Sequence, residues 1–179
     1  MKQSTQKVLA DKSRMEDFDM GLFKKKKKDS EVNNEITAEV SRKLDELAEK
    51  GNQLESAGRI DEALQAWNEA LSMIPEPQQF YSETVWFLAA IGDIHFQRGE
   101  YQQSYECFNK ARGNLSGGGY ANSFVMLRLG ESCLEIGDEK NATEYLLRAY
   151  MMEGKEIFAG EGDKQKYFEF LRTHVDIGE

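Results

Sequence analysis

The sequence predicts an all-α fold in which three helical hairpins stack in chain order and a last helix covers the open end. Three glycine pairs carry this prediction, because glycines seven residues apart occur at 51 and 58, 92 and 99, and 130 and 137. Each pair is followed at fixed distances by a small, a large apolar and another small residue: Ala63, Trp67, Ala70; Ser104, Phe108, Ala111; Ala142, Leu146, Ala149. Self-similarity at this period is typical of a stacked repeat.

The two glycines of a pair have different predicted roles. The second ends the first helix of its hairpin, since glycine commonly follows a helix C-terminus. The first lies within a helix, where glycine costs about 1 kcal/mol relative to alanine. We therefore expect it to let a neighbouring helix approach closely, with the large apolar residue filling the space between repeats.

The repeated residues resemble the tetratricopeptide repeat (TPR) motif, in which an apolar residue and glycine are followed by alanine, an aromatic residue and proline. The matching positions are Leu47, Gly51, Leu54, Ala63, Trp67, Ala70, Pro75; Leu88, Gly92, His95, Ser104, Phe108, Ala111; and Met126, Gly130, Cys133, Ala142, Leu146, Ala149. The resemblance implies a TPR-type α-α superhelix, a solenoid. Its repeats would span about 44–77, 85–118 and 123–156.

The hairpin helices are expected at 37–57 (with Thr37 as N-cap), 61–73, 78–98, 101–112, 122–136 and 139–153. The first glycines lie 41 and then 38 residues apart, more than the family's period of about 34. We assign the excess to "PEPQQFY" (75–81), as a lengthened helix start, and to "GNLSGGGYAN" (113–122), as a loop. Gly119 in that loop is expected to tolerate substitution.

A last helix at about 163–173 carries Tyr167, Phe168, Phe170 and Leu171. A solenoid exposes apolar surface at its ends. These side chains therefore favour a capping helix, and direct contact with a partner is the alternative.

Charge divides the chain into two parts. Residues 1–28 hold nine basic and four acidic groups (net +5), whereas residues 29–179 hold fourteen basic and twenty-eight acidic groups (net −14). The acidic part disfavours nucleic acid and favours a basic protein partner. Residues 1–34 lack periodicity and predict a disordered, Lys-rich tail, followed by one domain at 35–179.

Within the tail, "MGLFKKKKK" from Met20 resembles a natural start, which would make residues 1–19 an upstream extension. Lys24–Lys28 are interpreted as solubilising, and contact with anionic lipid, at about 1 kcal/mol per lysine, is the alternative.

The chain shows no apolar run long enough for a membrane span, no signal peptide and no cysteine framework, which predicts a cytoplasmic protein. We expect no catalytic residues, cofactor or metal site, and therefore no enzyme activity. His95 and Cys133 occupy equivalent repeat positions, but nothing supplies a third, orienting group. Both are interpreted as packing residues.

The resemblance also implies a concave face lined by the first helix of each repeat. Relatives that hold chaperone carboxylate tails use a clamp of Lys, Asn and Arg. Asn52 and Arg128 fit that clamp, whereas Ala48, Ala90 and Phe124 do not. The candidate partner-binding residues on this face are Asn52, Glu55, Trp86, Asp93, Phe96, Phe124, Arg128, Glu131 and Glu135. For Trp86, packing beneath residues 75–81 is the alternative.

Stretches such as "AAIGDIHFQRGEY" and "MLRLGESCLEIGD" resemble short bacterial TPR proteins encoded beside polymorphic toxins. The resemblance implies a non-catalytic immunity protein that binds and neutralises a cognate toxin domain. The chain has Asn122-Ser123-Phe124 where such proteins often carry Asn-Pro-Phe, which leaves the partner's identity open. The alternative is a general adaptor or assembly chaperone, membrane-peripheral through its Lys-rich tail.

Overall fold

The structure, a computed structural model, describes residues 36–159 and 164–178, and within them every regular element is helical. The predicted tail at 1–34 lies outside the described residues. The α-helices are α2 (Ala38–Ser56), α3 (Ile60–Met73), α4 (Glu83–Gln97), α5 (Tyr101–Arg112), α6 (Ser123–Glu135), α7 (Glu139–Glu153) and α8 (Lys164–His174). Two short 3₁₀ segments, η2 (Gln78–Phe80) and η3 (Gly154–Phe158), join them.

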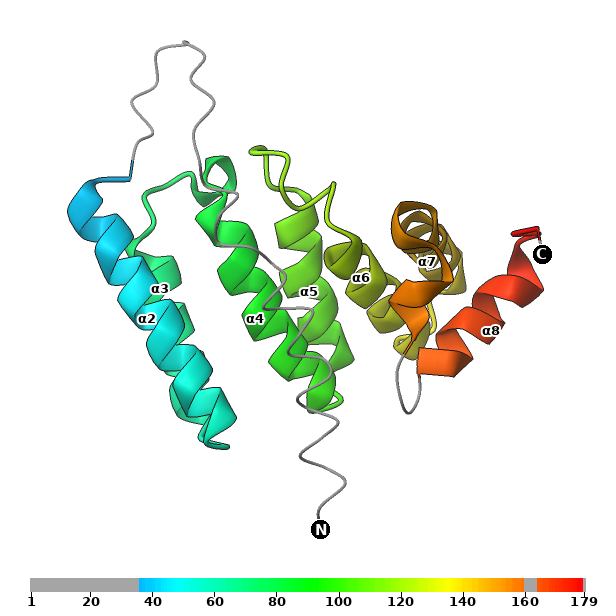
Figure 1. Ribbon diagram of the computed structural model, residues 1–179, viewed down its shortest axis with the longest axis horizontal. Helices are drawn as coiled ribbons and strands as arrows, with labels where there is room; N and C mark the ends of the chain where they lie inside the picture. Colours follow the sequence, from blue (N-terminus) through cyan, green and yellow to red (C-terminus); the bar gives the residue numbers. More distant parts are fainter. Residues whose placement is uncertain (1–35, 160–163, 179) are drawn as a thin grey trace.

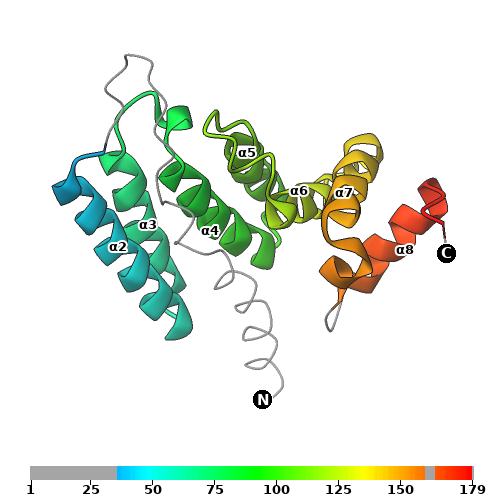
Figure 2. The ribbon, with the colours of Figure 1, turned by 45° about the horizontal axis from the view of Figure 1, so that its top comes forward.

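The α-helices pair into three hairpins, α2/α3, α4/α5 and α6/α7, which follow one another along the molecule (Figure 1). The same order is visible after rotation, with α8 at the C-terminal end (Figure 2). The all-α prediction is confirmed. Polar side chains cap three of the helix starts, because Thr37 Oγ1 accepts from Val40 N (3.3 Å), Asn122 Oδ1 from Val125 N (2.9 Å) and Asp138 Oδ1 from Asn141 N (3.2 Å).

The first glycine of each pair lies under the large residue of its own hairpin. A Cβ atom on Gly51 would lie 2.0 Å from Trp67 Nε1, and one on Gly130 would lie 2.6 Å from Leu146 Cγ. The large residues also reach the next hairpin, as Trp67 does with Trp86 at a ring-centroid distance of 6.1 Å. They therefore fill space within a hairpin as well as between hairpins.

The second glycines close the first helices as predicted. Gly58 has φ +74°, a conformation that only glycine adopts at little cost. Around it, Gly58 N donates to Glu55 O (2.9 Å) and Arg59 N to Leu54 O (2.8 Å), which is a Schellman motif. Gly99 and Gly137 repeat this conformation.

The two insertions pack on each other. Asn114 is 4% exposed, and its Nδ2 donates to Tyr81 O (2.8 Å), while Leu115 N donates to Gln79 O (2.7 Å). The expected lengthened helix start at 75–81 is wrong. The chain there forms only the short η2, because Gln78 turns back and its Nε2 donates to Leu71 O (2.6 Å) at the end of α3.

Gly119 is also corrected, since it is buried against the backbone. A Cβ atom there would lie 1.8 Å from Ala111 O at the end of α5. The loop is therefore anchored at Gly119, whereas Gly118 beside it has open space apart from Ser116 Oγ at 3.7 Å.

The last helix, α8, covers the third hairpin. Tyr167 and Phe168 are 3% exposed and Leu171 is fully buried in the same core cluster as Leu146. This is the packing expected of a cap, and Phe170 is only half-buried. Among the described residues, no helix is long and apolar enough to cross a membrane.

Candidate functional site

The nine candidate residues lie on α2, α4 and α6, the first helices of the three hairpins. Asn52 and Glu55 are half-buried on α2. Trp86, Asp93 and Phe96 come from α4, and Phe124, Arg128, Glu131 and Glu135 from α6. Their role in binding stays a prediction, but the structure decides which of them a partner can reach.

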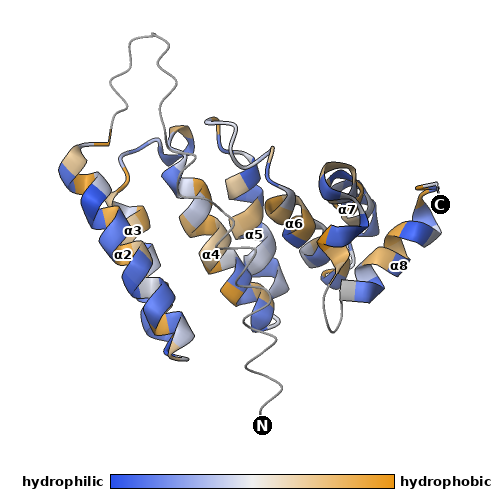
Figure 3. Cartoon of the chain, viewed as in Figure 1, coloured by the Kyte–Doolittle hydropathy of each residue, from blue (hydrophilic) through white to orange (hydrophobic). Residues whose placement is uncertain are grey.

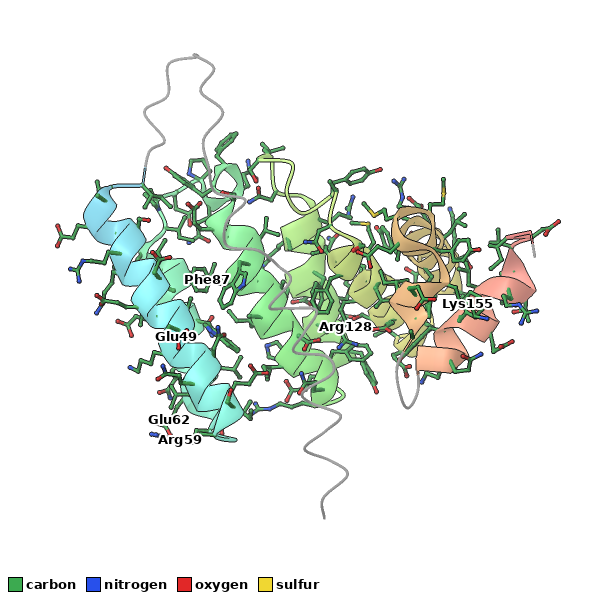
Figure 4. The ribbon with its side chains drawn as sticks, in the orientation of Figure 1. Glu49, Arg59, Glu62, Phe87, Arg128 and Lys155 are labelled. Carbon is green, nitrogen blue, oxygen red and sulfur yellow. The ribbon has the colours of Figure 1, made fainter. Side chains whose placement is uncertain are left out.

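Asp93 and Glu131 do not form an exposed acidic lining. Arg128 lies between them, with its Nε 2.6 Å from Asp93 Oδ1 and its Nη1 2.7 Å from Glu131 Oε2. The three side chains are 6% exposed or less. Arg128 is labelled between α4 and α6 in Figure 4. The three residues form a buried charge cluster that joins the second and third hairpins.

Two of the candidate aromatics enclose this cluster. The Arg128 guanidinium carbon lies 4.5 Å from the centre of the Phe96 ring and 5.5 Å from that of Phe124. Phe124 in turn meets Phe108 edge-on at a centroid distance of 5.9 Å. Cation–π contacts of this kind strengthen when the cation is desolvated. Both rings are half-buried and already packed, so neither is a free anchor.

Glu135 contacts α8. Its Oε1 accepts from Tyr167 Oη at 2.7 Å and lies 2.5 Å from Lys166 Nζ. Burial alone would raise the pKa of Glu135, but hydrogen bonds from Lys166 and Tyr167 and the charge of Lys166 outweigh it and lower that pKa. The Tyr167 ring also lies 6.5 Å from that of Phe96. The capping helix thus covers this end of the predicted face.

Trp86 is 6% exposed, so the expectation of an open aromatic anchor is wrong. Its ring packs edge-on against Trp67, at 6.1 Å, and against Phe87, at 5.0 Å. The alternative was packing beneath residues 75–81, and Trp86 does belong to the same buried cluster as Tyr81 at the end of that segment. The part of Trp86 that remains accessible forms one wall of a groove.

That groove lies between α2 and α4 and has a volume of about 280 Å³. Its lining combines an apolar floor with polar residues at the edge: Leu44, Ala48, Trp86 and Phe87, then Ser41, Asp45 and Glu83. Asp45 and Ser41 are exposed, and Glu83 is half-buried. Figure 4 labels Phe87 between the two helices. In Figure 3, hydrophilic residues cover much of the visible face of α2.

Of the groove residues, only Trp86 was among the nine candidates. Ala48 entered the sequence analysis only as a position that does not fit the carboxylate clamp. Phe87 was missed because it neighbours Trp86 in the sequence and was not counted as facing α2.

A second hollow of about 480 Å³ lies between α3, α4 and α5, next to the first insertion. Its apolar residues are Leu71, Pro77, Leu88, Ile91 and Cys107, and burial raises the pKa of the Cys107 thiol. Asn68, Glu76, Gln78 and Lys110 give it a mixed polar edge without a dominant charge.

The structure does not support Cys133 as a nucleophile with His95 as its base. Cys133 is fully buried, and burial together with the charge of Asp138 raises the pKa of its thiol to about 12. A thiol with that pKa stays protonated at neutral pH. The polar partner of His95 is Glu100, whose Oε2 lies 2.5 Å from His95 Nδ1 at the end of α4.

Within 36–159 and 164–178, no group of three or more His, Cys, Asp or Glu side chains is arranged to hold a metal ion. No protein-family model matches the chain.

Proposed function

We propose that this chain is a non-catalytic, TPR-type protein-binding module whose binding site is the groove between α2 and α4. The groove itself carries the proposal, because a hollow of about 280 Å³ with apolar walls has acidic residues at its edge. The TPR-type assignment is supported by the three hairpins, each with a helix-ending glycine at positive φ and an interior glycine under a large residue.

The groove defines the chemistry of the partner. A volume of about 280 Å³ is at the small end for a ligand site, so it suits one or two anchoring side chains of a longer segment. Asp45 and Glu83 at its edge favour positive charge beside that anchor. The partner is therefore a protein segment in which an apolar side chain lies next to lysine or arginine.

The charge of the body adds long-range attraction. The net charge of −14 over residues 29–179 speeds the encounter with a basic protein and makes the rate depend on salt. A cytoplasmic immunity protein that neutralises a basic toxin domain matches this chemistry, and it remains our first candidate role. A general adaptor would use the same groove for other basic segments.

The test is titration of a purified basic protein encoded next to this chain's gene, at low and high salt. Ser41→Trp narrows the groove and should weaken binding at least tenfold. Asp45→Lys should slow association and flatten its salt dependence. Glu49→Lys is the matched control, since Glu49 is exposed on the same helix but does not line the groove.

All three variants change exposed positions, so their melting temperatures should stay close to that of the parent chain. If Ser41→Trp and Asp45→Lys bind as tightly as Glu49→Lys, the groove is not the binding site.

A further inference from the structure

The groove accepts an apolar side chain beside positive charge, and the chain carries such a segment itself. Residues 20–28, "MGLFKKKKK", place Leu22 and Phe23 directly before five lysines. This segment lies outside the described residues. Its sequence nevertheless has the features that the groove selects, an apolar anchor with adjoining cations.

The segment joins the body at the helix that forms one wall of the groove. The described chain begins at Ile36 and enters α2 at Ala38, and the groove lining on α2 starts at Ser41. The helix rises about 1.5 Å per residue, so Ser41 to Ala48 covers roughly 10 Å. The thirteen residues from Phe23 to Ile36 reach up to about 45 Å when extended. Phe23 can therefore reach any point of the groove.

Because residues 20–28 are tethered to the body, even a weak affinity for the groove is enough for them to occupy it. A short linker gives a segment an effective concentration on the order of 1 mM at its site. A segment with a dissociation constant near that value would then occupy the groove about half of the time. Charge favours this occupancy, because a net +5 in residues 1–28 faces a net −14 in the remainder.

We propose that residues 20–28 bind in the α2–α4 groove of their own chain, with Leu22 or Phe23 on Leu44, one helical turn from Ser41, and with Lys24–Lys28 at the acidic edge. The segment is then a built-in competitor. An external partner binds only the fraction of molecules in which the groove is open, so its apparent affinity falls by that fraction. This inference rests on the groove proposed above as the binding site.

Disulfide trapping in the full chain tests the contact. The background variant Cys107→Ala removes the half-buried native thiol. In it, Phe23→Cys is combined with Ser41→Cys in the groove or with Glu39→Cys as the control. Glu39 is exposed, lies on the same turn of α2 and is nearer to residue 23 in sequence. Random collision therefore favours the control pair.

A disulfide requires Cα atoms within about 7 Å of each other. We expect the 23–41 pair to cross-link at least tenfold faster than the 23–39 pair under mild oxidation, measured by mass spectrometry. Replacing Lys24–Lys28 by glutamine, or working at 1 M salt, should slow the 23–41 pair several-fold, because charge holds the segment in place.

Equal rates for the two pairs would overturn the inference, and so would a 23–41 rate that is insensitive to both the lysines and salt. The result is separable from the proposed function. If cross-linking shows no preference while Asp45→Lys still impairs partner binding, the groove remains the binding site and only its occupation by residues 20–28 is refuted.

Discussion

Removing the cation from the buried charge cluster should strongly destabilise the protein. Arg128→Met keeps an unbranched side chain but leaves Asp93 and Glu131 buried together, each less than a tenth exposed. Breaking a buried pair by deleting one partner costs about 3–5 kcal/mol. For a domain of this size, each kcal/mol lowers the melting temperature by about 2–4 °C. We therefore expect Arg128→Met to lower it by about 6–20 °C.

The matched control is Arg59→Met. Arg59 also forms a close ion pair, with its Nη2 2.5 Å from Glu62 Oε2, but both side chains are at least half exposed. Figure 4 labels Arg59 and Glu62 at the outer end of the first hairpin and Arg128 between α4 and α6. Exposed ion pairs contribute little because water screens them. Arg59→Met should therefore melt close to the parent chain.

The assay is thermal and denaturant unfolding followed by circular dichroism. In Arg128→Met, adding Asp93→Asn and Glu131→Gln removes the uncompensated negative charge and should recover part of the loss. If Arg128→Met is as stable as Arg59→Met, the cluster does not hold the second and third hairpins together. If the triple variant is no more stable than the single one, lost packing of Arg128 between Phe96 and Phe124 is the cause, not charge.

Two further substitutions test the anchored loop and the cap. Gly119→Ala should lower the melting temperature clearly more than Gly118→Ala in parallel melts, because only the first places a Cβ atom against the backbone, at Ala111 O. Tyr167→Phe should destabilise the chain modestly by removing the hydrogen bond to Glu135. Because the pKa of Glu135 is lowered in the folded state, its stabilisation is fully present above its ordinary value of 4.5 and is lost as pH falls below it. The difference between Tyr167→Phe and the parent should therefore shrink in acid, and a pH-independent difference in unfolding free energy would refute this.

The helices and hairpins were predictable because local chemistry specifies them. A glycine at positive φ ends each first helix, and a glycine inside that helix has a large residue directly above it, as at Gly130 and Leu146. Both constraints repeat in the sequence at fixed spacing. The insertions were less predictable, since Gly119 and Asn114 are fixed by contacts with segments more than five residues away in the chain, at Ala111 and Tyr81.

The exposure of the site residues could not be obtained from spacing. Asn52, Asp93 and Glu131 occupy equivalent positions in the three hairpins, yet Asn52 is half-buried and both acids are almost fully buried. The difference comes from Arg128, which reaches from α6 to Asp93 on α4. Helix periodicity places a residue on a face, but it does not show which side chain of the next hairpin covers it.

The same comparison explains why the open groove lies between the first two hairpins. Between α4 and α6, the face is filled by Phe96 and Phe124 around Arg128, and Tyr167 of α8 adds a further ring. On α2, the equivalent face presents Ala48 and Asp45, which are too small or too polar to fill the space beside Phe87. The aromatic and charged residues of the second and third hairpins thus pack against each other and hold these hairpins together. Between the first two hairpins, a hollow of about 280 Å³ remains instead, which is why the proposed binding site lies there and not beneath the cap.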